Sequence, residues 1–327
     1  MGSEFDLISA IKKRQGGSAV PVGIGDDAAL LHTVEQPLIC TDMLVEGVHF
    51  RRSWSSAEDI GWKALAVNLS DIAAMGGRPT CYVCSLAKPA SLSNAWVLRL
   101  VEGMMACASA EADEESPWLV GGDLSGSPDR VVVSVTVLGH GPPTGSITRS
   151  GAAPGDEIWV IGRLGMASVG LEILSSDAPS EGYERALTAH RRPRALVGVG
   201  EAIGHLGAVS AMIDISDGLW QDLGHIAKAS QVGLSLDLRR VEVEDEVRHH
   251  CADDTRCMEC HLLTGGEDFA LALTVPKHGR TRVQRVADEA GVPAQRVGLV
   301  VSPDDGDTVI GLGGQTIDQI GGGFEHF

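Results

Sequence analysis

Acidic residues that stand directly beside apolar, strand-like runs are the feature of this sequence with the clearest chemical potential. Asp26 and Asp27 precede the run Ala28–Leu31, and Thr41 and Asp42 follow Leu38–Cys40. A carboxylate at the end of a strand is held rigidly, so several of them can be aimed at one point. Further acids occur in similar settings at Asp71, Asp123, Asp214, Asp217 and Glu267.

A group of carboxylates needs cations. Two of them about 4 Å apart repel each other by roughly 4 kcal/mol at an effective dielectric constant near 20. Their neighbours are Thr and Ser hydroxyls, and oxygen ligands favour hard ions such as Mg²⁺ when phosphates complete the shell. Phosphoryl transfer relies mainly on positioning and on charge neutralisation by metal ions. We interpret the acids as one divalent-metal and phosphate site; the alternative is that each acid merely caps a helix or closes a turn.

Composition narrows the class of protein. The chain has 327 residues, 43% hydrophobic and 21% charged, which is typical of a globular protein with room for two domains. Aromatic residues make up only 4%, so we expect a core of Ala, Val, Leu and Ile. The net charge of −18 argues against nucleic acid as a partner. Phosphorylated small molecules stay possible, because metal ions can supply the positive charge.

Neither a membrane span nor a signal peptide is expected. No apolar run approaches the roughly 18–20 residues that a span requires, and Phe5–Arg14 is amphipathic. We therefore predict a cytoplasmic protein without a membrane partner. The odd number of cysteines, seven, predicts reduced thiols.

One cysteine-rich stretch stands apart from the acids. His249, His250 and Cys251 are followed by Cys257, and then by Cys260 and His261. These residues could hold a zinc ion, but they form one CxxC motif without a second pair at finger spacing. We favour an exposed, loop-like insertion.

The first part of the chain mixes strands and helices. Strand-like runs at Val20–Leu31, Leu38–Leu44, Thr80–Leu86, Leu119–Asp123 and Val131–Val137 accompany helical patterns near residues 5–11, 57–76 and 92–112. Several strands in succession, rather than regular βαβ units, predict an α+β domain with a mixed sheet. Asp71 falls late in the Ala-rich helix, where an unpaired buried acid would be costly, so we assign it a metal or hydrogen-bonding role.

The second part predicts an α/β domain. The turn-rich segment Gly145–Gly155 is typical of a linker, which places domains at residues 1–145 and 146–327. A strand is expected at Glu157–Ile161, then a helix, and a polar connector over residues 175–195. Strand-like Ala211–Ile215 runs into a helix capped by Ser216 or Asp217, whose N–H groups can face an anion.

Eight blocks of sequence together resemble the thiamine-monophosphate kinase family, within the superfamily of aminoimidazole ribonucleotide synthetase. They are, in order, GIGDDAALL, TDMLVEGVHF, KALAVNLSDIAAMGG, VGGD, TRSGAAPGD, IDISDGLWQDLGHI, LTGGEDFAL and GGFEHF. The resemblance covers nearly the whole chain, from Phe5 to Phe327. Single motifs of this kind are weak, but eight in the same order are specific.

The resemblance implies a kinase, a transferase of thiamine diphosphate biosynthesis. ATP would phosphorylate thiamine monophosphate directly, by in-line transfer assisted by several Mg²⁺ ions and without a phosphoenzyme. It also implies a homodimer whose N-terminal domains bind ATP and Mg²⁺ and pair through their sheets, while each C-terminal α/β domain completes a site. A non-catalytic ATP-binding sensor or scaffold, or another ATP-using enzyme of the superfamily, is the alternative.

The resemblance also implies roles for individual residues. The metal ligands would be Asp27, Cys40, Thr41, Asp42, Asp71, Asp123, Asp214 and Asp217, with Asp27, Asp71, Asp123, Asp214 and Asp217 catalytic. ATP would be bound by Gly121, Gly122, Arg149 and Ser216, and the thiamine moiety by His49, Glu267 and Phe324. Arginine offers a planar fork for phosphate, glutamate an anion for cationic thiamine, and phenylalanine a ring for stacking.

Three of these assignments have structural alternatives, and three positions depart from the family pattern. Arg149 could tie the linker to an acid, His49 could be a packed core histidine, and Phe324 could close the core. Cys40 stands where the family commonly has Ser or Thr, Met43 replaces a frequent Thr, and Phe324 replaces Trp or Tyr. No core carboxylate is lost, so we expect an active enzyme.

Overall fold

The chain divides into two compact units. The computed structural model describes residues 4–15, 31, 36–112, 116–176, 179–318, 320 and 323. The first unit contains Met1–Ile72 and Gly77–Gly141, and the second contains Ala73–Gly76 and Pro142–Phe327. The strand-like run predicted at residues 20–31 lies outside the described residues apart from Leu31.

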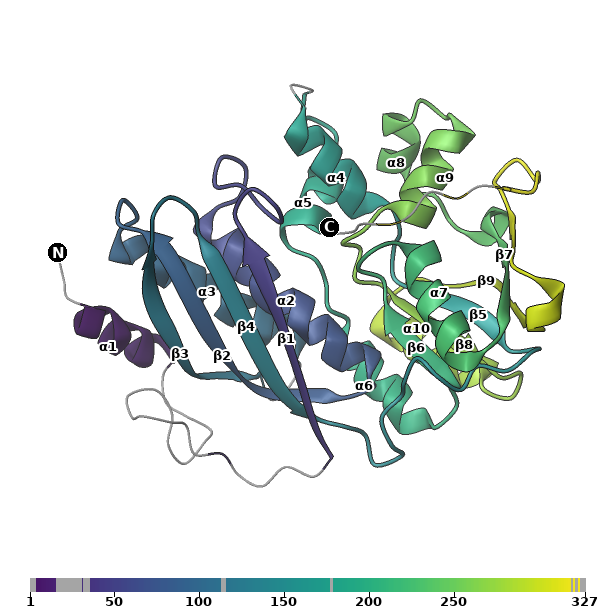
Figure 1. Ribbon diagram of the computed structural model, residues 1–327, viewed down its shortest axis with the longest axis horizontal. Helices are drawn as coiled ribbons and strands as arrows, with labels where there is room; N and C mark the ends of the chain where they lie inside the picture. The colour runs from purple at the N-terminus through teal and green to yellow at the C-terminus, as the bar shows by residue number, and fades with distance from the viewer. Residues whose placement is uncertain are drawn as a thin grey trace. The chain divides into compact units, whose positions relative to one another are not determined.

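The first unit is built on a four-stranded mixed sheet in the order β1-β4-β2-β3 (Figure 1). β2 and β3 run parallel, and the other neighbouring pairs are antiparallel. The elements of this unit are α1 (Glu4–Gln15), β1 (Pro37–Val45), α2 (Ala57–Ala74, whose last residues belong to the second unit), β2 (Arg78–Pro89), α3 (Asn94–Glu111), β3 (Trp118–Ser127) and β4 (Val132–His140).

Helices α2 and α3 cover one face of this sheet (Figure 1). Val133, Val135 and Val137 on β4 point toward the helices and are fully buried, as strict alternation along the strand requires. The two helices pack closely because of glycine. A Cβ at Gly61 would lie 1.9 Å from the carbonyl oxygen of Leu100, so no larger residue fits there.

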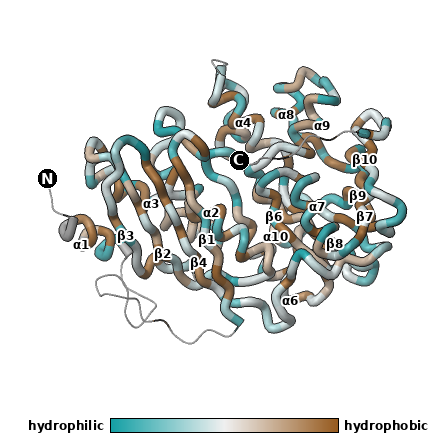
Figure 2. Tube along the Cα trace, viewed as in Figure 1, coloured by the Kyte–Doolittle hydropathy of each residue, from teal (hydrophilic) through white to brown (hydrophobic). Residues whose placement is uncertain are grey.

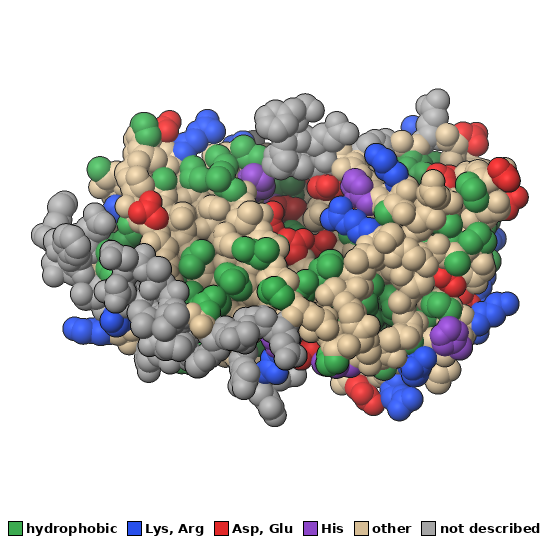
Figure 3. Space-filling view, turned by 60° about the horizontal axis from the view of Figure 1, so that its bottom comes forward, with side chains coloured by type: hydrophobic (Ala, Val, Ile, Leu, Met, Phe, Trp, Pro, Cys, Tyr) green, Lys and Arg blue, Asp and Glu red, His purple; other side chains and the backbone are tan. Residues whose placement is uncertain are grey.

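The opposite face of the sheet is open within this unit. Ile39 and Met43 on β1 alternate with the residues that face the helices, and they are 71% and 54% exposed. Figure 3 shows hydrophobic side chains spread over the surface of this unit. An antiparallel sheet tolerates one solvated face, but large exposed apolar side chains are typical of an interaction surface.

The second unit has a six-stranded sheet in the order β10-β7-β9-β5-β8-β6. Its neighbouring strands are antiparallel except for the parallel pair β10 and β7. The strands are β5 (Glu157–Ile161), β6 (Ala211–Asp214), β7 (Gly233–Asp237), β8 (Leu271–Val275), β9 (Ala294–Val301) and β10 (Thr308–Ile310). The helices are α4 (Met166–Ser175), α5 (Glu184–Arg191), α6 (Val197–Leu206), α7 (Leu219–Ser230), α8 (Asp245–His250), α9 (Thr255–Thr264) and α10 (Arg280–Ala290), with short 3-10 turns at Leu238–Arg240 and Pro303–Asp305.

Helices cover both faces of this second sheet. Ile158 and Val160 of β5 pack against α4, α5, α7, α8 and α9, whereas Trp159 and Ile161 pack against α6 and α10. β5, β6 and β8 are buried along their whole length and are therefore mostly apolar in sequence, which Figure 2 shows as brown segments. The unit is a three-layer α/β/α domain.

Two stretches that we expected to be polar connectors are helical. α5 lies within residues 175–195 and buries Ala186, Leu187 and His190. α8 and α9 replace the expected loop near residues 249–261, and α9 buries Met258 and Leu262. Both stretches are rich in charged and polar residues, but a few apolar positions at helical spacing suffice to anchor a short helix.

The predicted fold class is confirmed: an N-terminal α+β unit with a mixed sheet is followed by an α/β unit. No helix in the part of the chain that the structure describes is both long and apolar enough to cross a membrane.

Candidate active site

In the first unit, a strand and a helix bring three predicted site residues together. Cys40 and Asp42 are two residues apart on β1, so both side chains face the side of the sheet that the helices cover. They pair with Val137 and Val135 of β4, which are buried. The Cys40 thiol lies 3.2 Å from the carbonyl oxygen of Asn68 on α2. Burial raises the pKa of that thiol far above its ordinary value, and the nearby carboxylates of Asp71 and Asp42 raise it further. Asp71 also shares a hydrogen bond with it, so Cys40, Asp42 and Asp71 form one cluster.

This cluster has the electrostatics of a cation site. Desolvation by the surrounding protein raises the pKa of Asp42, although its side chain keeps access to solvent. A carboxylate whose charge is disfavoured in this way is stabilised when a cation binds between it and a second carboxylate. The oxygen donors of Asp42 and Asp71 fit Mg²⁺, and the neutral thiol of Cys40 is the weakest donor of the three for a hard ion.

Thr41 lies on the other side of the sheet. Its hydroxyl donates to the carbonyl oxygen of Val135 at 3.0 Å and accepts from the hydroxyl of Thr136 at 2.9 Å. Side chains alternate between faces along a strand, so the residue between Cys40 and Asp42 cannot point toward their cluster. The structure therefore does not bring the Thr41 hydroxyl to Asp71, and its role as a ligand stays a prediction.

Gly121, Gly122 and Asp123 lie on β3, at the far edge of the same sheet from β1. β4 and β2 stand between these edges, so about 14 Å of sheet separates the two strands. A Cβ at Gly122 would lie 2.0 Å from the carbonyl oxygen of Cys84, which explains why glycine is required there. Within one chain, Asp123 is too far from Asp42 to share an ion with it.

His49 is held in a turn that follows β1. Its Nδ1 accepts a hydrogen bond from the backbone N–H of Val45 at 3.0 Å. The buried Lys63 on α2 donates from Nζ to the carbonyl oxygen of His49 at 3.3 Å. These contacts fix the turn, and the sequence analysis missed Lys63. Its isolated position in an Ala-rich helix, WKALAV, was the available signal.

In the second unit, a strand end and the loop after it gather three carboxylates. The buried Asp214 ends β6, Asp217 follows in the loop, and Asp222 lies in the first turn of α7. Oδ2 of Asp222 accepts from the backbone N–H groups of Asp217 at 3.0 Å and Gly218 at 3.1 Å. Burial raises the pKa of Asp222 to about 7, and the charges of Asp217 and Asp214 contribute. Asp222 was not among the residues predicted for the site.

A glycine turn lies beside this loop and places Glu267 there. The N–H of Glu267 donates to the carbonyl oxygen of Ser216 at 2.8 Å, and that of Phe269 donates to Ile215 at 2.8 Å. A Cβ at Gly266 would lie 2.7 Å from the oxygen of Ser216, so this approach requires glycine. Oε2 of Glu267 lies 2.9 Å from Nδ1 of the buried His190, a neighbour on α5 that sequence analysis missed. The predicted residues Asp214, Ser216, Asp217 and Glu267 therefore converge.

Asp268 supports the turn from the other side. Its two carboxylate oxygens accept from the N–H groups of Gly165 at 2.7 Å and Ala167 at 3.2 Å, at the start of α4. Burial raises the pKa of Asp268 to about 7, whereas these backbone hydrogen bonds lower it. A carboxylate at a helix N-terminus is also favoured by the helix dipole. Asp268 was not among the residues predicted for the site, but it positions its neighbour Glu267.

Of the remaining predicted residues, Arg149 lies away from these clusters, and two others are not described. Arg149 is exposed, and its carbonyl oxygen accepts from the Ser230 hydroxyl at 3.2 Å, at the end of α7 far from Ser216. The preceding Thr148 accepts from the N–H of Met212, near the start of β6. Asp27 and Phe324 lie outside the described residues. The roles of all three stay predictions.

Comparison with known proteins gives the class of the fold. Residues 25–140 match the family described as AIR synthase related protein, N-terminal domain, and residues 153–311 match its C-terminal domain. The protein thus contains both domains of this class in their usual order.

Relatives at the level of whole chains narrow the class further. Thiamine-monophosphate kinase of Bacillus subtilis (strain 168) is 36% identical over 305 residues, which are 91% of this chain and 91% of the relative. The crystal structure of thiamine-monophosphate kinase from Stenotrophomonas maltophilia K279a superposes with a TM-score of 0.81 at 34% identity, covering 94% of this chain and 97% of that one. AaThiL complexed with AMPPCP and TMP gives a TM-score of 0.76 at 31% identity, covering 99% and 97%. The chain belongs to the thiamine-monophosphate kinase family.

Proposed function

We propose that this protein transfers the γ-phosphoryl group of ATP to the phosphate of thiamine monophosphate, with Mg²⁺ as the metal, to form thiamine diphosphate. The observation that carries the proposal is the meeting of Asp42 and Asp71 at Cys40. These two carboxylates come from different elements of a chain whose relatives are thiamine-monophosphate kinases. One relative binds AMPPCP and TMP, which supports ATP and thiamine monophosphate as the substrates here.

Mg²⁺, when bound, neutralises phosphate charge and aligns the reacting oxygens. In the first unit, Asp42 and Asp71 would hold it with Asp27 and Cys40, and Thr41, whose hydroxyl lies on the other face of the sheet, would act as a ligand only through its backbone. The backbone at Gly121 and Gly122 would lie against ATP beside Asp123. In the second unit, Asp214 and Asp217 would be further ligands. Ser216 and Arg149 would bind the nucleotide.

The thiamine moiety is cationic, so its partners should be anionic or aromatic. Glu267 is held by its backbone N–H and is flanked by His190, which suits an anion that must keep a fixed position. His49 and Phe324 would complete this subsite. Asp268, tied to the start of α4, fixes the turn that carries Glu267.

The protein is proposed to act as a homodimer in the cytoplasm. The open face of the first sheet, with Ile39 and Met43 largely exposed, supports pairing between N-terminal units. A second copy covering this face would remove those apolar side chains from water. The N-terminal unit would then bind ATP and Mg²⁺ and form the dimer, and the C-terminal unit would contribute the remaining residues of the site.

A second candidate function is binding of ATP without turnover, as in a sensor or scaffold. Cys40 favours it, because a neutral, half-buried thiol in the first cluster weakens that site for a hard ion. Under this alternative the acids would still bind a metal–nucleotide complex.

One assay separates the two candidates. The purified protein is incubated with ATP, MgCl₂ and thiamine monophosphate, the thiamine phosphates are oxidised to fluorescent thiochromes, and these are separated by chromatography. We expect a thiamine diphosphate peak that grows with time and disappears when MgCl₂ is replaced by a chelator. Nucleotide binding measured by calorimetry, without any diphosphate, would replace the kinase proposal with the sensor.

A further inference from the structure

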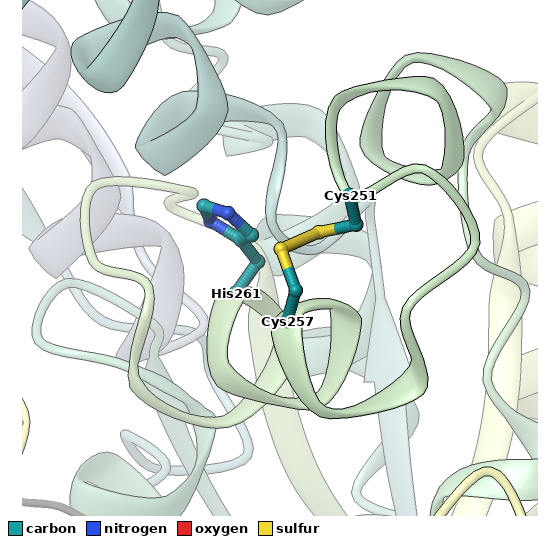
Figure 4. A group of neighbouring side chains, drawn as sticks. All are labelled: Cys251, Cys257 and His261. Atoms are coloured by element: carbon teal, nitrogen blue, oxygen red, sulfur yellow. A yellow bond between two sulfur atoms is a disulfide. The ribbon is translucent and has the colours of Figure 1, made fainter.

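A disulfide joins two helices of the second unit. Cys251, directly after α8, is bonded to Cys257 in the first turn of α9, and their Cα atoms are 5.5 Å apart (Figure 4). The sequence analysis expected reduced thiols throughout, and the structure corrects this for the pair. The bond is possible because the turn between the helices folds Cys251 back over α9.

His261 lies beside this pair. It follows Cys257 by four residues, one helical turn, and therefore projects from the same face of α9. One ring nitrogen of the buried His261 and the two sulfur atoms all lie within 4.8 Å of one another. Two cysteines and a histidine at this separation are a zinc donor set.

The hydrogen bonds of Ser168 fix which nitrogen of His261 is available. The Ser168 hydroxyl donates to the carbonyl oxygen of Gly165 at 3.1 Å, and its oxygen lies 2.9 Å from Nδ1 of His261. Since the single hydroxyl proton is used, the oxygen accepts from Nδ1–H. The lone pair of the ring is then on Nε2. A metal-binding histidine is normally oriented by such a bond from its other nitrogen.

Glu172, which lies beside His250, can supply a further ligand. Glu172 on α4, His250 on α8 and His261 form a second group whose donor atoms lie within 4.8 Å of one another. The Glu172 carboxylate lies 3.9 Å from Nε2 of His261 and 2.8 Å from Nε2 of His250. Its side chain is 60% exposed, so it can reorient toward the sulfur atoms without disturbing a core. It is therefore suited to be the fourth ligand.

We propose that the reduced form of this cluster binds Zn²⁺ through Cys251, Cys257, His261 and Glu172. A dithiol reductant gives two electrons and two protons to the disulfide, becomes a cyclic disulfide itself and leaves two thiols. Zn²⁺ binding then releases both protons and gives two thiolate–zinc bonds. The two sulfur atoms need to separate only to about 3.8 Å, because zinc–sulfur bonds are about 2.3 Å in tetrahedral sites.

The proposed cytoplasmic location favours the reduced form of the Cys251–Cys257 pair. Disulfides are rare where thioredoxin-like and glutathione systems keep thiols reduced. In a cytoplasmic enzyme the pair would therefore exist mainly as thiols, which leaves the donor set ready for the metal. Such a site would clamp α4, α8 and α9 together, all within the second unit, and the proposal is independent of the kinase reaction.

Co²⁺ is the probe, because thiolate ligands give it near-ultraviolet charge-transfer bands that carboxylate sites do not. The full-length protein is reduced with dithiothreitol, freed of reductant without air and titrated with Co²⁺, then with Zn²⁺ as competitor. We expect a band that saturates at one Co²⁺ per chain and is displaced by one equivalent of Zn²⁺. Untreated protein that retains the disulfide should give no band.

Variants locate the site. Cys257→Ser and His261→Asn should each lose the saturable band, whereas Cys260→Ser should keep it. Cys260 is a matched control, since it lies on the same helix but is exposed, and its thiol contacts Thr264. Circular dichroism and the thiamine assay confirm that each variant is folded. A reduced wild type without the band, or a band that survives in Cys257→Ser, overturns the proposal.

Discussion

The two carboxylate clusters are held in different ways. In the first unit, Asp42 and Asp71 project from a strand and a helix, and what lies between them is the thiol of Cys40. In the second unit, a buried third acid, Asp222, fixes the loop of Asp217 through two backbone N–H groups. Regular elements position the first cluster without help, whereas the second depends on a loop that one side chain holds. The first cluster should therefore be sensitive to charge, and the second to geometry.

Removal of a charge from the first cluster should have the largest effect. Asp71→Asn keeps the size of the side chain but removes a negative ligand, and metal ions contribute several kcal/mol to phosphoryl transfer. We expect kcat/KM to fall by about 10³-fold, equivalent to about 4 kcal/mol. The measurement is the chromatographic thiochrome assay at saturating Mg²⁺.

Glu102→Gln is the matched control for this experiment. Glu102 lies on α3 in the same unit and pairs with Arg14 at the surface, where an ion pair contributes little. Its activity should equal that of the wild type. Near-normal activity in a folded Asp71→Asn variant would remove Asp71 from the metal site.

Truncation of Asp222 tests the dependence on geometry in the second cluster. Asp222→Ala removes the acceptor for two N–H groups, so the loop of Ser216 and Asp217 loses its fixed position. A misplacement of about 1 Å can cost on the order of 10²-fold, and we expect a loss of kcat/KM of roughly 10- to 100-fold.

Asp222→Asn separates geometry from charge. Both N–H groups bond to the same oxygen, Oδ2, so an amide oxygen in its place can accept both. Activity should therefore stay within about threefold of the wild type, an energy change below about 1 kcal/mol. If the Asn variant is as inactive as the Ala variant, charge and not geometry governs this cluster as well.

The raised pKa of Asp222 predicts a pH dependence of stability. Its pKa is about 7 in the folded protein and 3.8 ordinarily, so the folded state binds the extra proton between these values. The free energy of unfolding must then fall as pH rises from about 4 to 7, by up to about 1.4 kcal/mol per pH unit. Above pH 7 both states are ionised and the contribution is constant.

Denaturant unfolding in a chelator at pH 5, 6, 7 and 8 measures this slope. In Asp222→Asn the free energy of unfolding should fall less steeply with pH, because the proton that Asp222 binds no longer contributes to the slope. Asp305→Asn, at an exposed acid, should have the slope of the wild type. Equal slopes in the wild type and Asp222→Asn would mean that Asp222 is ionised throughout.

Sequence alone predicted most strands and the acids that follow them, because alternation and glycine turns are local signals. β5 was predicted with its observed bounds, and Asp214, Ser216, Asp217 and Glu267 converge as expected. Lys63 and His190 were missed because each becomes significant only through a contact with another segment. The same applies to α9, whose polar sequence concealed a buried face. Asp222 was missed although its partners lie only four and five residues before it. Thr41 shows a further limit: its neighbours in sequence lie on the opposite face of the sheet.

The substitution with the smallest expected effect on activity is at Cys40, whose sulfur atom lies near the two acids of the first cluster. Cys40→Ser replaces a neutral, half-buried thiol by a hydroxyl, which is a harder donor and suits Mg²⁺ better. The serine oxygen can keep the contact that the thiol makes with the carbonyl oxygen of Asn68, so the fold should not change. We expect the Mg²⁺ concentration for half-maximal rate to fall by about two- to fivefold, an energy of about 1 kcal/mol or less.

Magnesium titrations of both proteins at fixed ATP measure this change. Cys107→Ser, at a buried thiol of α3, is the control for cysteine loss. A higher magnesium requirement in Cys40→Ser would mean that the thiol is itself the better ligand, and that the first cluster is built for a softer ion than the second.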